Sequence, residues 1–193
     1  MTKGQKTKQQ LYHCALELFR EKGYDNVSVN EIVEKAGTAK GTFYVHFSSK
    51  AAVISEMFHE YDDYYLEIEE QMDNNAPVLK RLEEFIRASC SFTEEKIGLD
   101  MIRVLYLNQL TEGEIEQDAL RTDRALYQII TKLLIQGQES GELKKIFKVE
   151  QMVAWIVRSI RGTFYEWAIK EGSFSLSEEC LRYVHALIYG LKA

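Results

Sequence analysis

The chain has 193 residues, enough for one or two domains that bury about 70% of the surface exposed by the unfolded chain. It contains one proline and eleven glycines, and this scarcity of turn-forming residues favours long helices over sheets with many turns. Its net charge of −6 excludes a protein that is coated on all sides with positive charge for nucleic acid.

The charge is distributed unevenly along the chain. Residues 1–50 contain eight Lys and Arg against five Asp and Glu, a net charge of +3, whereas residues 51–193 contain sixteen against twenty-five, a net charge of −9. The asymmetry indicates two parts with different partners. Lys3, Lys6 and Lys8 belong to the basic part, and the sequence leaves open whether they form a disordered, solubilising tail or an arm that enters the minor groove of DNA.

The cysteines and the apolar segments bear on the compartment. Cys14, Cys90 and Cys180 are odd in number and far apart, so they predict neither a disulfide framework nor a zinc site. The basic start of the chain does not resemble a signal peptide, and no stretch approaches the ~18 uncharged residues of a membrane span. We therefore expect a cytoplasmic protein with no role at a membrane.

Apolar residues recur at intervals of three and four residues along most of the chain, a pattern typical of amphipathic helices. The predicted helices are, in chain order, a first one ending at Gly23, a short one that opens with a capping box at Ser28–Glu31 and ends at Gly37, Lys40–Phe47, a long one over about 49–73, one beginning beyond Pro77, Leu99–Leu110, Leu120–Leu134, Glu150–Lys170 and Ser177–Leu191. We therefore predict an all-α fold of about nine helices and no strand.

The second and third predicted helices are separated by about three residues and form a helix-turn-helix, a unit whose second helix enters the major groove of DNA. In Lys40–Phe47 the side chains of Phe43 and Phe47 anchor the helix, while the polar side chains project toward DNA. Gly41 costs this helix about 1 kcal/mol relative to Ala, which suggests the close approach of a phosphate or of a neighbouring helix. Lys50 opposes the dipole of the next helix, so a phosphate partner explains it best.

The stretch from Ser28 to Lys50, and above all its run Gly-Thr-Phe-Tyr-Val-His-Phe-Ser-Ser-Lys, resembles the DNA-binding signature of the TetR/AcrR (tetracycline-repressor) family of bacterial transcriptional regulators. The resemblance implies a DNA-binding domain over residues 1–50 and a larger helical ligand-binding and dimerisation domain over residues 51–193, joined by the helix at about 49–73. It also implies a repressor that leaves a palindromic operator when a small-molecule inducer binds. The DNA-contacting residues implied are Ser28, Thr38, Lys40, Gly41, Thr42, Tyr44, His46 and Lys50.

Two positions depart from the family pattern. Thr38 stands where the family commonly has Val, and Ala39 where it commonly has Ser, so any contact made by that Ser is lost here. Thr38 keeps the shape of Val and adds a hydroxyl group. We therefore expect this hydroxyl to cap the helix that follows.

Two long helices of the acidic part, Glu150–Lys170 and Ser177–Leu191, are apolar nearly all round. A helix that is buried on two sides must cover a second surface. The resemblance implies that these helices pair with those of a second copy in a four-helix bundle, and a central helix within a monomer is the alternative. The residues expected at the dimer interface are Val184, Ile188 and Leu191.

Aromatic and arginine side chains of the acidic part are candidates for an inducer site. Aromatic stripes at helical spacing commonly form core, and buried guanidinium groups such as that of Arg161 either pair with carboxylates or bind an acidic inducer. A cavity among the aromatic side chains would suit a flat or aliphatic ligand, and the surplus of acid leaves a cationic one open. The candidates are Tyr61, Tyr65, Phe92, Arg103, Tyr106, Trp155, Arg158 and Phe164.

Three functions compete: a ligand-responsive, dimeric DNA-binding repressor, a helical small-molecule sensor or protein-interaction module without DNA binding, and an all-helical enzyme. The sequence has no legible nucleophile with its base, phosphate loop or metal set, so no catalytic residue is predicted. His59, Asp62 and Asp63 have the spacing of metal ligands, but no further ligand is identifiable and a solvated helix face is expected. We predict the repressor, with double-stranded operator DNA, a small-molecule inducer and a second copy as partners, and with no metal or cofactor.

Overall fold

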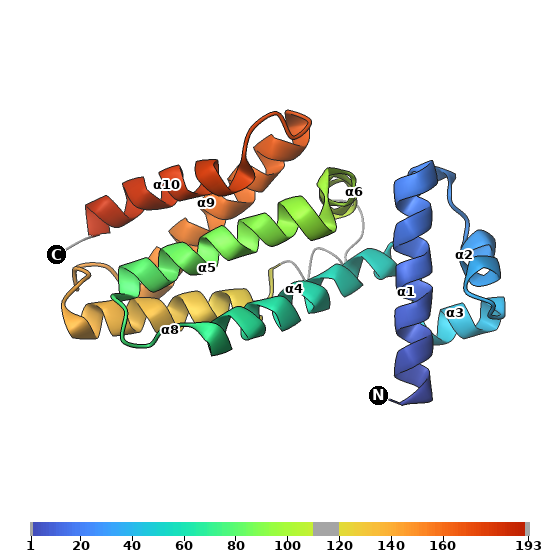
Figure 1. Cartoon of the computed structure of the whole chain (residues 1–193), viewed down its shortest axis with the longest axis horizontal. Helices are drawn as coiled ribbons and strands as arrows, with labels where there is room; N and C mark the ends of the chain where they lie inside the picture. Colours follow the sequence, from blue (N-terminus) through green and yellow to red (C-terminus); the bar gives the residue numbers. More distant parts are fainter. Residues whose placement is uncertain (1, 110–119, 192–193) are drawn as a thin grey trace. The chain divides into compact units, whose positions relative to one another are not determined.

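The computed structural model describes residues 2–109 and 120–191, which contain nine α-helices and no strand (Figure 1). In chain order the helices are α1 (Lys3–Lys22), α2 (Val29–Lys35), α3 (Lys40–His46), α4 (Ala52–Gln71), α5 (Val78–Phe92), α6 (Leu99–Gln109), α8 (Ala125–Ser140), α9 (Val149–Ile169) and α10 (Leu176–Leu191). A 3₁₀ turn, η1 (Tyr24–Asn26), follows α1, and a π-helical turn, η2 (Thr93–Ile97), follows α5. The predicted all-α fold is confirmed.

The first helix begins earlier than the apolar pattern indicates. The side chain of Thr2 accepts a hydrogen bond from the amide of Gln5 (3.2 Å), and the Gln5 side chain accepts one from the amide of Thr2 (2.6 Å), so a capping box opens α1. Lys3, Lys6 and Lys8 therefore lie on the first turns of a helix and do not form a disordered tail, while the entry of this end of the chain into the minor groove stays a prediction.

The chain divides into two compact units. Unit 1 consists of Met1–Glu60 with Asp100–Leu120, and unit 2 consists of Tyr61–Leu99 with Arg121–Ala193. The division falls within α4, later than the predicted domain boundary at residue 50, so α4 contributes residues to both units. The sequence pattern did not indicate that α6 belongs to unit 1.

Unit 1 is built on α1, which contacts both α2 and α3 (Figure 1). Leu11, Ile32 and Phe43, one from each of these helices, are fully buried and form the centre of its core. Tyr12 of α1 is also buried and donates its hydroxyl to the carboxylate of Glu60 on α4 (2.6 Å). Burial and the neighbouring carboxylate both raise the pKa of Tyr12, so the phenol stays a hydrogen-bond donor at neutral pH.

Unit 2 is a bundle in which α5 contacts both α8 and α10, and α9 packs against the same two helices (Figure 1). Leu82 and Phe85 of α5 are fully buried at its centre. Val184, Ile188 and Leu191 of α10 are only 0%, 6% and 3% exposed in the single chain. These three residues are therefore part of the subunit's own core, and their predicted place at a dimer interface stays a prediction.

Membrane-spanning helices and metal-binding clusters are both absent from the described residues. None of the helices in residues 2–109 and 120–191 combines the length and apolarity needed to cross a bilayer. Within the same residues, no three His, Cys, Asp or Glu side chains are placed to hold a metal ion. Of the predicted solvated face, Asp62 binds Arg124 through two contacts of 3.0 Å, and His59 lies 3.3 Å from Glu56.

Candidate nucleic-acid interface

The segment between α2 and α3 makes a tight turn. At the start of α2 the hydroxyl of Ser28 accepts a hydrogen bond from the amide of Glu31 (3.3 Å), and the carboxylate of Glu31 accepts one from the amide of Ser28 (2.9 Å). Gly37 follows the end of α2 with φ of 61°, a conformation that favours glycine, and α3 begins three residues later at Lys40. The predicted capping box and the predicted stop at Gly37 are both confirmed.

Thr38 does not have the role expected from the sequence. No side chain caps α3, whose N-cap residue is Ala39, and the hydroxyl oxygen of Thr38 is buried without a hydrogen-bond partner. The amide of Thr38 donates to the carbonyl of Val33 (2.9 Å) and so closes the end of α2. The prediction that Thr38 caps α3 is wrong, because the turn directs its side chain inward, and its hydroxyl is not exposed for the implied DNA contact.

α3 turns one side toward the unit and the other toward solvent. Phe43 and Phe47 are 0% and 3% exposed, and their ring centres lie 5.5 Å apart, so their predicted anchoring role is confirmed. At 100° per residue, Gly41 and Val45 lie on the side opposite Phe43. Both are exposed, Val45 by 78%.

The four polar candidates of α3 occupy its flanks. Lys40 and Tyr44 are exposed, whereas Thr42 and His46 are half-buried. The ring of Tyr44 stands edge-on to Phe43, with 5.4 Å between ring centres, which limits its movement while half of the side chain stays in solvent. The structure therefore places the four side chains on one short helix, on either side of its outward face.

The outward face itself consists of small and apolar residues. A Cβ added to Gly41 would meet nothing within 4 Å, so no neighbouring helix among the described residues explains this glycine, and its approach to DNA stays a prediction. Val45 was not among the residues predicted from the sequence, although its position one turn after Gly41 was a usable signal. Val45 offers methyl groups of the kind that contact the thymine methyl in the major groove.

Lys50 is held by the protein itself. Its ammonium donates to the carbonyl oxygens of Tyr24 (2.6 Å) and Val27 (3.0 Å) and lies 4.0 Å from the centre of the Tyr24 ring. Burial lowers the pKa of Lys50. Backbone carbonyls therefore account for the position of this lysine without a phosphate. A DNA contact of the same group stays a prediction.

The hydroxyl of Ser28 is also engaged, since it donates to the Glu31 carboxylate (2.9 Å). Glu31 accepts a further hydrogen bond from Lys22 (2.7 Å). The hydrogen bonds from Lys22 and Ser28 lower the pKa of Glu31 to about 2, so its carboxylate is charged at neutral pH. The phosphate contact predicted for Ser28 would have to compete with this carboxylate.

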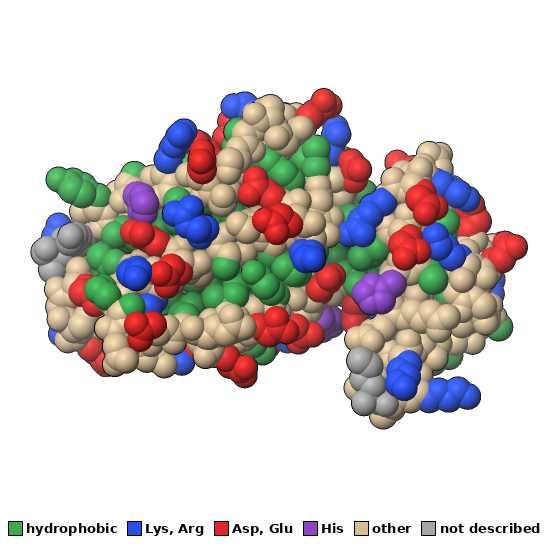
Figure 2. Space-filling model, viewed as in Figure 1, with side chains coloured by type: hydrophobic (Ala, Val, Ile, Leu, Met, Phe, Trp, Pro, Cys, Tyr) green, Lys and Arg blue, Asp and Glu red, His purple; other side chains and the backbone are tan. Residues whose placement is uncertain are grey.

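The N-terminal end of α1 adds basic side chains beside α3. A Cβ on Gly4 would lie 4.0 Å from Cε1 of His46, so the first turn of α1 reaches the end of α3. Lys3 and Lys6 are exposed on this part of α1, and Figure 2 shows basic side chains gathered at this end of the helix. The first turn of α1 contains no acidic residue, and a helix N-terminus favours anions. The sequence pattern, which begins at Leu11, could not place the first turn of α1 beside His46.

Three of the predicted inducer residues lie together in unit 2. The ring centre of Tyr61 is 5.7 Å from that of Tyr65 and 5.4 Å from that of Phe92. Both tyrosines are 5% exposed, and their hydroxyls are bonded within the protein, Tyr61 to Thr93 (2.8 Å) and Tyr65 to Ser89 (2.9 Å). The cluster is a packed core with its polar atoms satisfied, so a ligand would have to displace existing contacts.

The other inducer candidates do not join this cluster as a set. Trp155 packs against Phe147 from the loop before α9, with 5.1 Å between ring centres. Arg158 is exposed on α9, so the expectation of a buried guanidinium there is wrong. Arg103 and Tyr106 lie on α6, which belongs to unit 1, and Phe164 is buried in α9.

Comparisons with known proteins cover nearly the whole chain. Residues 11–57 match the family model "Bacterial regulatory proteins, tetR family", and residues 58–190 match "YsiA-like protein, C-terminal region". A curated relative, "Fatty acid metabolism regulator protein" of Bacillus subtilis, is 26% identical over 86% of each chain.

Two similar solved structures are complexes with acyl-CoA ligands. The FadR regulator from Bacillus subtilis in complex with stearoyl-CoA has a TM-score of 0.78 at 23% identity and covers 95% of this chain and 98% of its own. Thermus thermophilus FadR in complex with lauroyl-CoA has a TM-score of 0.74 at 20% identity, with 96% and 95% covered. At this identity the two structures establish a shared fold.

The contacts of Lys50 predict that its loss destabilises unit 1. In Lys50→Met the carbonyls of Tyr24 and Val27 lose their charged donor, and we expect the free energy of unfolding to fall by about 1–2 kcal/mol in urea titrations. The salt dependence of DNA binding should stay that of the parent. A variant as stable as the parent, whose salt slope is lower by about 1, would instead assign Lys50 to a phosphate. Lys40→Met is the control, because Lys40 is exposed on α3.

Proposed function

Since the chain belongs to the TetR family of bacterial regulatory proteins and is a ligand-responsive DNA-binding repressor, we propose that α3 binds operator DNA and that a long-chain acyl thioester of coenzyme A releases it. The observation that carries the DNA-binding role is the outward face of α3, where Gly41 leaves space for close approach and the side chain of Val45 is 78% exposed. Lys40, Thr42 and Tyr44 flank this face with donors for bases and phosphates. No observation favours a sensor that does not bind DNA.

The basic end of α1 supports the same orientation. Lys3 and Lys6 are exposed on the first turns of α1, and Gly4 of the same turns lies near His46 of α3, so a duplex lying against α3 would pass close to this basic end of α1. These contacts add affinity without reading sequence, because phosphates are alike at every base pair. In this proposal α3 contacts the bases and α1 contributes phosphate contacts.

A homodimer is part of the proposal, and an exposed stripe of α9 supports it. Arg158, Gly162, Tyr165 and Ile169 recur at steps of four, three and four residues, and all four are exposed. Tyr165 and Ile169 are 53% and 60% exposed, which is unusual for apolar residues at consecutive turns of one helix face. A Cβ on Gly162 would meet nothing within 4 Å, so this position permits the close approach of a partner helix.

α10 supplies a second exposed stripe. Tyr183, Ala186, Tyr189 and Gly190 are exposed on it, Tyr189 by 85%, while the opposite side carries the buried core residues. Two such stripes on each copy can form a twofold-symmetric four-helix contact. A dimer also accounts for DNA recognition at a palindrome, because two α3 helices about 34–36 Å apart enter successive turns of the major groove.

The acyl-CoA assignment is supported by the two similar regulators whose structures contain stearoyl-CoA and lauroyl-CoA. Unit 2 has a core of aliphatic and aromatic side chains, and an acyl chain is the part of such a ligand that this core can accommodate. The cluster of Tyr61, Tyr65 and Phe92 is its proposed site, where the acyl chain would separate rings that now touch.

α4 is the proposed route from inducer to DNA. In unit 1 its Glu60 accepts a hydrogen bond from Tyr12 of α1, and in unit 2 its Asp62 binds Arg124 at the start of α8. These two anchors lie only two residues apart on one helix. A ligand that moves α8 or α4 within unit 2 therefore acts on the residue that holds α1. It changes DNA affinity only if it binds the two arrangements unequally.

The outward face of α3 predicts opposite effects of one substitution on stability and on DNA binding. In Gly41→Ala the added methyl group lies in open space, so the free energy of unfolding, measured by thermal unfolding, should rise by up to about 1 kcal/mol. Operator affinity, measured by fluorescence anisotropy, should fall at least about tenfold. Gly37→Ala is the control for stability. Because Gly37 has φ of 61°, Ala at this position should lower the free energy of unfolding by about 1–2 kcal/mol. Operator binding by Gly41→Ala equal to that of the parent would contradict the assignment.

The stripe on α9 predicts the oligomeric state. Light scattering of the parent should give twice 22.4 kDa, and Ile169→Lys should give monomers that remain folded, because Ile169 is 60% exposed within the subunit. Ile146→Lys is the matched control, because Ile146 is 74% exposed outside the two stripes and its change should leave the dimer intact. A parent that is monomeric at micromolar concentration, or a dimeric Ile169→Lys variant, would refute this interface.

The proposed inducer predicts a reciprocal effect on DNA binding. With an operator selected from random DNA, saturating stearoyl-CoA should weaken DNA binding about 5–150-fold, the range of a coupling of ~1–3 kcal/mol. Coenzyme A without an acyl chain is the control and should leave affinity unchanged. Calorimetry should show that operator DNA weakens stearoyl-CoA binding by the same factor. Equal DNA affinity with and without stearoyl-CoA would rule out this inducer class while leaving operator recognition in place.

A further inference from the structure

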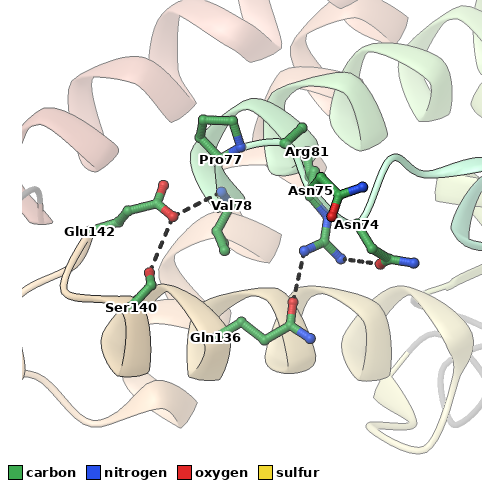
Figure 3. A pocket seen from close by; sticks show the side chains of 9 residues that line it. Asn74, Asn75, Pro77, Val78, Arg81, Gln136, Ser140 and Glu142 are labelled. Carbon is green, nitrogen blue, oxygen red and sulfur yellow. Dashed lines mark hydrogen bonds between the residues drawn. The ribbon is translucent and has the colours of Figure 1, made fainter.

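An open pocket of about 780 Å³ lies where the turn between α4 and α5 meets the end of α8 and the loop after it (Figure 3). All of its lining residues belong to unit 2 and lie outside the cluster of Tyr61, Tyr65 and Phe92. Its polar groups come from Asn74, Asn75, Arg81, Gln136, Ser140 and Glu142.

Arg81 is the buried cation of this pocket, with only 5% of its surface exposed. Its Nη1 donates to Oε1 of Gln136 (2.9 Å), its Nη2 donates to Oδ1 of Asn74 (3.1 Å), and its Nε is buried without a partner. Among the described residues no carboxylate lies within ion-pair distance of this guanidinium. A buried guanidinium ordinarily pairs with an anion, whereas here two neutral amide oxygens take the two positions that an anion's oxygens would occupy (Figure 3).

Glu142 lines the same pocket, but its charge is used elsewhere. Its carboxylate accepts hydrogen bonds from the amides of Val78 (3.0 Å) and Leu79 (3.2 Å) at the start of α5, and from the hydroxyl of Ser140 (3.1 Å). Although partial burial acts to raise the pKa of Glu142, these hydrogen bonds and the positive charge of Arg81 hold it below its ordinary value. The carboxylate is therefore fixed at the helix N-terminus, and the hydrogen-bond partners of Arg81 are the two amide oxygens.

We propose that this pocket binds the anionic group of a small molecule, a carboxylate or a phosphate, with the guanidinium of Arg81 as its anchor. The anion would take the places of the Asn74 and Gln136 oxygens on the two Nη atoms. Both side chains can then rotate and present their NH₂ groups to the ligand, and Asn74 has the freedom to do so because it is exposed in the turn. The site is independent of the acyl-CoA proposal.

Other ligand chemistries fit this pocket less well. A cation would be repelled by Arg81, and the oxygens of Glu142 that could attract it already accept three hydrogen bonds. A neutral ligand offers Arg81 the same kind of carbonyl acceptor that Gln136 and Asn74 already supply. An anion replaces two neutral hydrogen bonds with charge-assisted ones in a bidentate arrangement, which are roughly twice as strong.

The direct test measures the thermal midpoint of the full chain in sodium phosphate or sodium acetate, against sodium chloride at equal ionic strength. At ten times its Kd, a one-site anion should raise the midpoint by about 3–6 °C for a chain of this size. A response to phosphate alone assigns phosphorylated ligands, a response to acetate alone assigns carboxylates, and a response to both assigns either class. Absence of any gain over chloride overturns the proposal.

A substitution that supplies the missing carboxylate makes the test specific to Arg81. In Asn74→Asp a carboxylate oxygen stands where the amide oxygen Oδ1 now lies 3.1 Å from Nη2 of Arg81. The thermal midpoint without added anion should therefore rise by about 2–4 °C. The affinity for added anion should fall at least about tenfold, because the new carboxylate occupies the site. Asn75→Asp is the matched control, because it adds the same charge to the same pocket on a side chain that does not bind Arg81. Its midpoint should stay near that of the parent.

The two variants must differ for the proposal to hold. If Asn74→Asp and Asn75→Asp change the midpoint and the anion response equally, the effect reflects general charge and not the guanidinium, and the proposal fails. None of these measurements involves DNA or acyl-CoA. Failure of the anion site therefore leaves the repressor function untouched, and loss of operator binding in other experiments leaves the anion site untouched.

Discussion

A helix of seven residues is too short to be stable in water by itself, and the architecture of unit 1 depends on this constraint. α3 persists because Phe43 and Phe47 are buried and because the helix packs against both α1 and α2. Burial of that side obliges the opposite side, with Gly41 and Val45, to face solvent. The packing that stabilises the helix thus also exposes the surface assigned to DNA, so stability and presentation of the reading surface have one cause.

In unit 2 the same division of helix faces separates the core from the surface assigned to a partner. α10 buries Val184 and Ile188 against its own subunit and leaves Tyr183 and Tyr189 in solvent. At one end of the bundle, polar side chains make the contacts between helices. Glu142 accepts a hydrogen bond from the amide at the start of α5, and Arg81 donates to two side-chain amides. A buried guanidinium without a carboxylate in ion-pair contact is costly, and this cost is what makes the pocket at Arg81 a candidate for an anion.

Much of the fold could be predicted from the sequence because local rules decide it. Helical periodicity, the capping box at Ser28 and the stop at Gly37 act over three or four residues, and each is present in the structure. The anchoring role of Phe43 and Phe47 follows from their spacing of one turn. The run from Gly41 to Lys50 is specific enough to indicate the family without any knowledge of packing.

What a side chain touches across the fold was decided by the tertiary structure alone. Lys50 meets carbonyls from residues more than twenty positions away, Val184 faces its own subunit, and the hydroxyl of Thr38 turns inward. The sequence by itself determined the helices and the face of each that is apolar, because these depend on neighbours within a turn or two. Two things depend on helices brought together from distant parts of the chain: which of two apolar surfaces lies inside a subunit, and which carbonyl or carboxylate contacts a given charge. Periodicity carries no information about how those helices pair.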